Sequence, residues 1–326
     1  MIELEPQVWE MLGRYIGAGF ALGLGGIGAA VGMGIAAGQA NEGIMRQPET
    51  QGYMLRTMLI GQAVGGSPSI FALVIGLLLL FLPAGRLEGA NFAAAMIGAG
   101  LSIGMGCFGS GLGCGWPAGK ACDGVARNPR SSTTVTSSMV IGQAVAQSPS
   151  IFAIVISLML IFVVSAPASA LTAFGVFVGA GIAMGAGALG PGIGSGQTAS
   201  GAVHGTARWP ESSTMVLRTM LIAQAVSQTP AIFGMLVAFI LMLSSGNLPV
   251  GIIGFAVTMG AGISAGFGGI GPGIGSGMVG DYACQVTAAK PRLDALVLRT
   301  MLIGQAVSQS TAIYALIIGL LLLFVI

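Results

Sequence analysis

The stretch Gly304-Gln305-Ala306-Val307-Ser308-Gln309-Ser310-Thr311 occurs in four versions along this chain. Its near-copies begin at Gly61, Gly142 and Ala223, so neighbouring copies are always 81 residues apart. Four units of this length account for 324 of the 326 residues. A period of this size indicates one supersecondary unit repeated in tandem. We therefore expect four repeats, at residues 1–86, 87–167, 168–248 and 249–326.

The composition is that of a membrane protein. Charged residues make up 7% of the chain and hydrophobic residues 54%, and the mean hydropathy is +0.92. A soluble protein carries about a quarter charged residues. Each repeat has two apolar stretches of roughly 30 residues, and about 20 suffice to span a bilayer. The sequence predicts an all-α membrane protein whose eight transmembrane helices form four tandem helical hairpins, near residues 9–43, 52–83, 90–124, 132–165, 170–205, 213–245, 249–286 and 294–325.

The basic residues predict the orientation of the hairpins. Ten of the twelve Lys and Arg residues lie beside the loops within the repeats, and only Arg14 and Arg86 lie at the other end. Cytoplasmic loops carry an excess of Lys and Arg. We therefore expect an integral, multi-pass membrane protein with cytoplasmic loops and both termini on the opposite side. The net charge of +2 gives no reason to expect a nucleic-acid partner.

The two helices of each hairpin differ in kind. The first has glycine at near-alternate positions, from Gly17 to Gly34 in the first repeat, and the series recurs every 81 residues. Glycine inside a helix costs about 1 kcal/mol relative to alanine, so a dense series indicates close backbone approach. Two glycine faces suit an inner ring of first helices, and the leucine-rich second helices suit a lipid-facing outer layer. A compact bundle of eight helices is the alternative, but it leaves the glycine bias unexplained.

A polar cluster lies near the centre of each second helix, where Gln, Ser and Thr must face other protein because hydrocarbon cannot pair them. A proline removes the hydrogen bond to the carbonyl four residues earlier. Pro68, Pro149 and Pro230 therefore free the carbonyls of three valines, which are Val64, Val145 and Val226. Two uses of these carbonyls stay open. They hold a cation or a water, or they accept interhelical hydrogen bonds at a kink.

At these residues the chain resembles the c subunit, the rotor-ring proteolipid of F-type ATP synthases. The resemblance covers the whole length, four times over, and rests on the glycine-rich first helix, the Gly-Gln-Ala-Val helix and the loop between them. It implies oligomerisation into a closed c-type ring surrounded by lipid, with other c subunits, the stator a subunit and the soluble central stalk as partners. The loop residues that it implicates in docking are Arg46, Gln47, Pro48, Arg127, Asn128, Pro129, Arg208 and Pro210.

One departure from the family is central. The ion-carrying glutamate of the family falls on Gly66, Gln147, Gln228 and Gln309, and no apolar stretch has Asp or Glu in its middle third. Sodium beside a neutral amide would leave an uncompensated charge in a medium of low dielectric constant. We therefore expect no bound cofactor or metal, and bound Na⁺ is disfavoured. Residues left for a residual polar or ion site are Val64, Ser67, Val145, Ser148, Ser195, Val226, Thr229, Ser276, Val307, Ser310 and Tyr314.

Two functional hypotheses follow. The first is a rotor-ring component of an ATP synthase that does not move ions by the usual mechanism, and that shares its ring with carboxylate-bearing copies or uses another group. The second is a c-like structural ring that has lost ion transport and serves as a scaffold or docking platform. An enzyme is not expected, because the single histidine, His204, has no acid or base partner in the sequence and no phosphate-binding loop is present.

Overall fold

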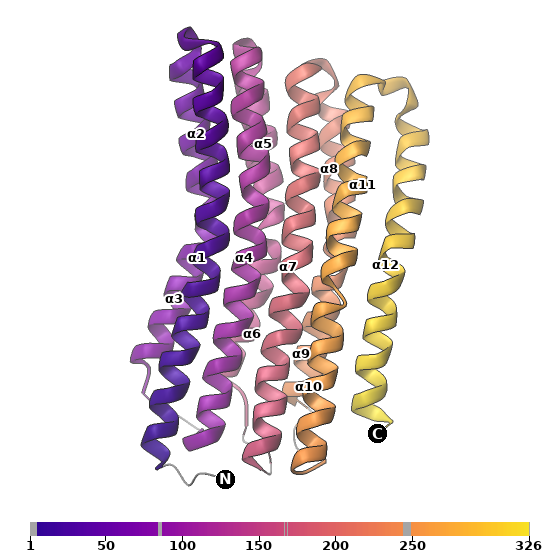
Figure 1. Cartoon of the computed structure of the whole chain (residues 1–326). Helices are drawn as coiled ribbons and strands as arrows, with labels where there is room; N and C mark the ends of the chain where they lie inside the picture. Colours follow the sequence, from indigo (N-terminus) through magenta and orange to yellow (C-terminus); the bar gives the residue numbers. More distant parts are fainter. Residues whose placement is uncertain (1–4, 84–86, 166, 168, 244–248, 326) are drawn as a thin grey trace.

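The computed structural model describes residues 5–83, 87–165, 167, 169–243 and 249–325, and every regular element in these ranges is a helix. Four antiparallel hairpins lie side by side in chain order (Figure 1). Eight helical segments of 34 to 41 residues are long and apolar enough to cross a membrane. The predicted all-α membrane architecture of four tandem hairpins is therefore confirmed.

The first helices form one layer. They are α1 (Pro6–Arg46), α4 (Gly89–Arg127), α7 (Ala170–Arg208) and the pair α10 (Ile252–Phe267) and α11 (Ile270–Ala289). In this layer α1 packs on α4, α4 on α7, and α7 on both α10 and α11. The 41 residues of α1 reach about 60 Å at 1.5 Å per residue, twice the thickness of the hydrocarbon core. The helices therefore project beyond the lipid tails, as expected.

The second helices form the other layer. They are α2 (Gln51–Gly65) with α3 (Ser67–Phe81), α5 (Ser132–Ala146) with α6 (Ser148–Phe162), α8 (Ser213–Ser227) with α9 (Thr229–Leu243), and the single helix α12 (Asp294–Phe324). Bulky apolar side chains on this layer face outward, among them Ile70, Val74 and Phe81 on α3. The two layers run across the molecule from α1 to α12, so the alternative of a compact eight-helix bundle is wrong (Figure 1).

The second helix is not continuous in three of the four repeats. It is interrupted at Gly66, Gln147 and Gln228, two residues before each proline. Each proline lacks an N–H to continue the helical bonding. Thr311 stands at this position in the fourth repeat, and α12 is unbroken there.

The predicted helix over 249–286 is also interrupted, at Gly268 and Gly269. Pro272 removes the helical bond to the carbonyl of Gly268. The aligned Pro191 is accommodated inside the unbroken α7, where alanine stands in place of Gly269. Gly269 follows the residue whose carbonyl lost its helical hydrogen bond, and glycine has a lower helical propensity than alanine. The helix therefore breaks at Gly268 and Gly269.

Short turns join the helices of each hairpin. One 3₁₀ turn follows each first helix, and the four are η1 (Pro48–Thr50), η2 (Pro129–Ser131), η3 (Pro210–Ser212) and η5 (Pro291–Leu293). Each first helix thus ends two residues before one of the aligned prolines. The links between repeats, at 82–86 and 244–249, lie in large part outside the described residues. Arg86 and the predicted repeat boundaries at 86, 168 and 248 lie outside them as well.

Glycine sets the spacing of the inner layer. A Cβ atom on Gly100 of α4 would overlap the carbonyl oxygen of Gly17 of α1. The same relationship joins Gly181 to Gly98 and Gly262 to Gly179. Only glycine permits backbones to approach this closely, which is the reason for the glycine series.

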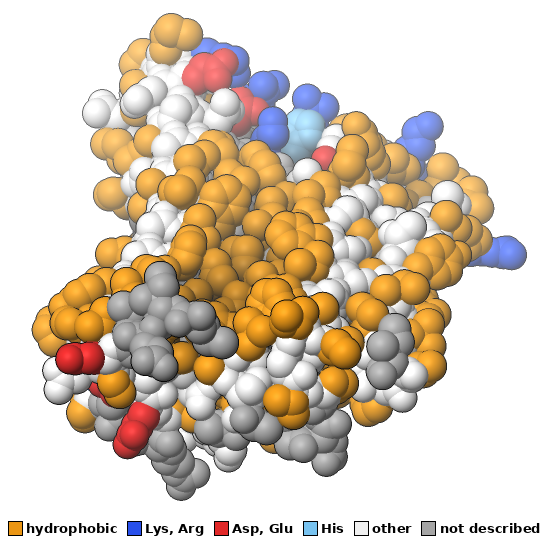
Figure 2. All heavy atoms as spheres, turned by 60° about the horizontal axis from the view of Figure 1, so that its bottom comes forward, with side chains coloured by type: hydrophobic (Ala, Val, Ile, Leu, Met, Phe, Trp, Pro, Cys, Tyr) orange, Lys and Arg blue, Asp and Glu red, His pale blue; other side chains and the backbone are white. Residues whose placement is uncertain are grey.

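Polar and apolar side chains separate along the hairpins. Figure 2, in which the end opposite the loops comes forward, shows hydrophobic side chains over the middle of the molecule and Lys and Arg gathered at the far end. Arg46, Arg127 and Arg208 end their helices there. The chain is an integral membrane protein with an apolar belt and a basic loop end.

Candidate functional site: buried amides between the hairpins

A glutamine from each of three second helices joins two hairpins. Gln143 is fully buried, and its Nε2 atom lies 3.0 Å from the carbonyl oxygen of Gly61 in the preceding hairpin. The same atom lies 2.9 Å from the carbonyl oxygen of Cys114 in its own hairpin. Both neighbours are acceptors, so the nitrogen end of the amide must face them. Gln143 therefore ties three helices, α2, α4 and α5, together.

The same arrangement recurs at the next two interfaces. Gln224 donates to the carbonyls of Gly142 at 2.9 Å and Ser195 at 3.0 Å. Gln305 donates to those of Ala223 and Ser276, both at 3.0 Å.

Gln62 makes only one of these two hydrogen bonds, the one within its own hairpin. It donates to the carbonyl of Met33 in its own hairpin at 3.1 Å. No hairpin precedes the first one in the described chain, so the second acceptor has no counterpart there.

A second set of amides occupies the positions of the family's glutamate. Gln147 Nε2 donates to the carbonyl of Val64 at 2.8 Å, and Gln228 donates to that of Val145 at 3.0 Å. Gln309 donates to the carbonyl of Val226 at 3.1 Å. These side chains are 7–8% exposed, and each bond crosses from one hairpin to the preceding one. Each carbonyl that a proline frees thus accepts a bond from the next hairpin. Gly66, the fourth position, has no side chain to do this.

The first helices contribute unequally to these amides. The Oγ atom of Ser276 lies 2.8 Å from Gln309 Nε2, and the Sγ atom of Cys114 lies 3.8 Å from Gln147 Nε2. Ser195 instead shares a 3.3 Å hydrogen bond with Ser227. The structure therefore brings Ser276 to the amide of its repeat but leaves Ser195 apart from Gln228.

Of the remaining residues of the predicted polar site, only Thr229 joins one of these amides. The hydroxyl of Thr229 donates at 2.8 Å to the carbonyl of Val226, the same carbonyl that accepts from Gln309. The hydroxyls of Ser67 and Ser310 donate to carbonyls of their own hairpins, those of Ala63 and Val307, at 3.5 and 2.8 Å. Ser148 makes no side-chain hydrogen bond within the described ranges. Val307 and Tyr314 lie on the free face of α12 and are 69% and 63% exposed.

The electrostatic character of the three interfaces is neutral. A carbonyl oxygen that accepts an amide N–H has one of its two lone pairs directed at a donor, and the positive end of that N–H lies where a cation would bind. The Oε1 atoms of Gln143, Gln224, Gln305 and Gln309 are buried and have no donor among the described residues. The site therefore offers acceptor oxygens but no negative charge to offset a cation in a medium of low dielectric constant.

The predicted docking residues lie together at the loop end. Asp123 Oδ1 lies 3.1 Å from Arg46 Nη1 and 3.1 Å from Arg127 Nε, so it links the first two hairpins. Arg46 also pairs with Glu42. Arg208 lines a cavity of about 360 Å³ with His204 and other residues of α7 and α11. Residues between the helices supply the turns, namely Gln47, Pro48, Asn128, Pro129 and Pro210.

Comparison with known proteins identifies the family. The family model that describes the ATP synthase C subunit matches residues 16–79, 97–160, 178–241 and 259–322, once in each hairpin. The chain belongs to the ATP synthase c-subunit family. The match covers the first helix, the loop and the second helix of every repeat, including all the amides described above.

Relatives within the family differ in length. The ATP synthase c subunit of Natranaerobius thermophilus is 56% identical over 78 residues, which are 24% of this chain and 90% of the relative. The chloroplastic ATP synthase c subunit of Ostreococcus tauri is 50% identical over 66 residues, 20% of this chain and 80% of the relative. The K subunit of the A-type ATP synthase of Methanocaldococcus jannaschii is 28% identical over 231 residues, 70% of this chain and 94% of that protein. The c-subunit relatives thus match one hairpin, whereas the K-subunit match extends over several.

Proposed function

We propose that this chain is a membrane-ring component of a rotary ATP synthase and that the sites between its hairpins do not carry ions. Four c-subunit hairpins in one chain support the first part of the proposal. The second part rests on the amides of Gln147, Gln228 and Gln309, which bond to the carbonyls that would otherwise be open to an ion.

The two ends of the inner layer support assembly into a ring. Gly19 and Gly34 of α1 have open space beside them, whereas their counterparts Gly100 and Gly115 in α4 abut the preceding helix. At the other end of the layer, Gly271 of α11 has open space beside it, whereas its counterpart Gly190 in α7 abuts the following helix, α11. Each end of the chain therefore presents the surface that the other end buries internally. A second copy, or a family member of one hairpin, fits at either end.

The polar groups at the two ends are complementary as well. Gln62 has a bond to its own hairpin and none to a preceding one. By the spacing of the other three glutamines, the missing acceptor would be the carbonyl of Gly304 in a neighbouring copy. An open end would leave such groups facing lipid, where an unsatisfied polar group costs several kcal/mol. Ring closure satisfies them.

A rotor site must gain and lose charge as it moves. Moving one charge through the membrane potential is worth about 2.3 kcal/mol per 100 mV, and an amide has no ionisable group with which to exchange it. Carboxylate-bearing c subunits in the same ring would then supply the transport. The loops would face the cytoplasm by the distribution of Lys and Arg, with the loop end available to the central stalk and the outer layer to the stator a subunit.

The same amides favour a second candidate, a ring that has kept the architecture as a scaffold or docking platform. Native mass spectrometry of the ring extracted from its own membrane separates the two. The rotor proposal expects this chain together with carboxylate-bearing c subunits and soluble ATP synthase subunits. A ring of this chain alone, without synthase subunits, favours the scaffold. A stable monomer contradicts both.

A further inference from the structure

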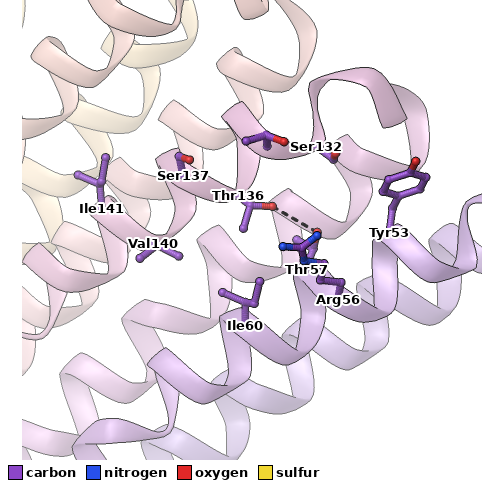
Figure 3. Close-up of a pocket in the computed structure, with 10 residues that line it drawn as sticks. Tyr53, Arg56, Thr57, Ile60, Ser132, Thr136, Ser137, Val140 and Ile141 are labelled. Carbon is purple, nitrogen blue, oxygen red and sulfur yellow. Dashed lines mark hydrogen bonds between the residues drawn. The ribbon is translucent and has the colours of Figure 1, made fainter.

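The outer faces of α2 and α5 enclose a groove near the loop end (Figure 3), with a volume of about 540 Å³. We call it the α2–α5 groove. Its polar lining comes from both helices and consists of Tyr53, Arg56, Thr57, Ser132, Thr133, Thr136 and Ser137. The hydroxyls of Thr57 and Thr136 lie 3.3 Å apart and join the two walls. No acidic side chain lines this groove within the described part of the chain.

The equivalent position in the third hairpin shows what the α2–α5 groove lacks. Arg218 is the counterpart of Arg56, and its Nη1 atom lies 3.7 Å from the Oδ2 atom of Asp294 in the next hairpin. At the place of Asp294, the second hairpin has Ser132. Arg56 forms no ion pair with any described residue. The retained arginine thus faces a carboxylate at the third interface and a hydroxyl residue, Ser132, at the first.

The depth of Arg56 matches the headgroup region of a bilayer. Arg56 lies ten residues before Gly66, which is close to the middle of the apolar segment Pro48–Phe81. Ten residues of helix rise about 15 Å, which is half the thickness of a hydrocarbon core of about 30 Å. On the side of the groove nearer the membrane centre, Ile60, Val140 and Ile141 complete the lining. The groove is therefore polar at the level of lipid phosphates and apolar at the level of acyl chains.

We propose that the α2–α5 groove binds the phosphate group of an anionic phospholipid. Arg56 pairs with the phosphate oxygens, and the hydroxyls of Ser132 and Thr136 donate hydrogen bonds to them. Ile60 and Val140 contact the first carbons of the acyl chains. A lipid fits better than free phosphate, because the cavity continues from the charged end into an apolar one. Basic pockets between transmembrane helices are a recognised setting for anionic lipid headgroups. This proposal does not depend on transport or on ring composition.

The test is native mass spectrometry of the full-length protein in detergent, titrated with dioleoyl phosphatidylglycerol or dioleoyl phosphatidylcholine. We expect one retained phosphatidylglycerol per chain, bound at least about tenfold more tightly than phosphatidylcholine, and Arg56→Gln should weaken it about tenfold. Ser132→Asp, which copies the third interface, should remove the preference.

Controls separate this site from general charge and from free anions. Arg130→Gln removes the same charge from an exposed position at the same end, outside the groove, and should leave lipid retention unchanged. Millimolar inorganic phosphate should not displace the lipid. A melting temperature within a few degrees of wild type identifies variants that fold. Unchanged phosphatidylglycerol binding in folded Arg56→Gln and Ser132→Asp would overturn the proposal, and displacement by inorganic phosphate would contradict a lipid site.

Discussion

The amide nitrogen of Gln228 lies 3.0 Å from the carbonyl oxygen of Val145, on the preceding hairpin. Pro149 denies that carbonyl its helical donor, so the glutamine supplies one from outside the helix. A buried carbonyl without a donor costs about 1–3 kcal/mol. The amide thus satisfies the acceptor, couples two hairpins and keeps the interface neutral with a single side chain.

Restoring an acid at such a position should create an ion site. Ser276 Oγ accepts from the amide of Gln309, and in Gln309→Glu this hydroxyl turns to donate to the carboxylate. The carbonyl of Val226 then loses its amide donor, keeps the hydroxyl of Thr229, and has a lone pair free to coordinate a cation. We expect the variant to react with a hydrophobic carbodiimide at residue 309 and Na⁺ to slow the reaction. Peptide mass spectrometry gives the site of modification, and the wild-type chain, which should be unmodified at this depth, is the control. A variant that reacts at the same rate with and without Na⁺ would show that the other ligands are not in place.

The contribution of each cross-hairpin glutamine to the free energy of unfolding should increase with the number of hydrogen bonds that it donates. Gln224→Leu removes the donor from two buried carbonyls and should lower the free energy of unfolding by about 1–3 kcal/mol. Gln62→Leu removes one bond in the isolated chain and should cost about half as much. In the assembled ring the two variants should become equal, because Gln62 gains its second acceptor. Thermal unfolding of monomer and ring measures both differences, and equal losses in the monomer would count against this bond pattern.

Substitutions at two aligned glycines should have different effects, one on the folding of the chain and the other on its assembly into rings. Gly100→Val places side-chain atoms on the backbone of Gly17 and should destabilise the chain by about 3 kcal/mol or more. Gly19→Val changes the aligned position on the open face of α1, so the chain should fold normally and fail to form rings. Circular dichroism reports the fold and native mass spectrometry the oligomer. Rings that form normally from Gly19→Val would place the contact between copies elsewhere.

The ion pairs at the loop end should matter little for stability. Asp123→Asn removes the bridge between Arg46 and Arg127, whose side chains are about half exposed, and should cost at most about 1 kcal/mol. Salt screens such pairs, so the difference in melting temperature between variant and wild type should shrink as NaCl rises from about 0.05 M to about 0.5 M. A difference that does not change with salt would indicate a packing role for Asp123.

Sequence patterns predict the repeated architecture well because each depends on local chemistry. The period of the Gln62 series sets the number of hairpins, and the apolar length sets the number of spans. The breaks at Gly66 and at Gly268 were harder to predict, because a helix either accommodates a proline without interruption or is interrupted by it. Pro191 lies inside α7 without a break, so a proline alone does not decide the outcome. The packing of neighbouring helices and the presence of adjacent glycines decide whether the helix is interrupted.

The site was only partly predictable. The freed carbonyl of Val64 follows from Pro68, but its partner Gln147 lies 83 residues further along the chain, at a distance set by the stagger of two hairpins. The recurrence of glutamine in all four repeats was the available signal for the ties made by Gln143 and its counterparts. For the α2–α5 groove, the signal was the exchange of Asp294 for Ser132 beside a retained arginine. Only the packing of α2 on α5 turns that exchange into a cavity.

The most direct test of the central claim is ion transport by an ATP synthase whose ring contains this chain alone. The enzyme would be reconstituted in liposomes, energised with ATP, and assayed for Na⁺ uptake with ²²Na⁺ and for H⁺ uptake with a pH-sensitive dye. Neutral amides at Gln147, Gln228 and Gln309 predict ATP hydrolysis, if any, without coupled uptake of either ion. Uptake of Na⁺ or H⁺ that depends on ATP and stops with an uncoupler or ionophore would contradict the account.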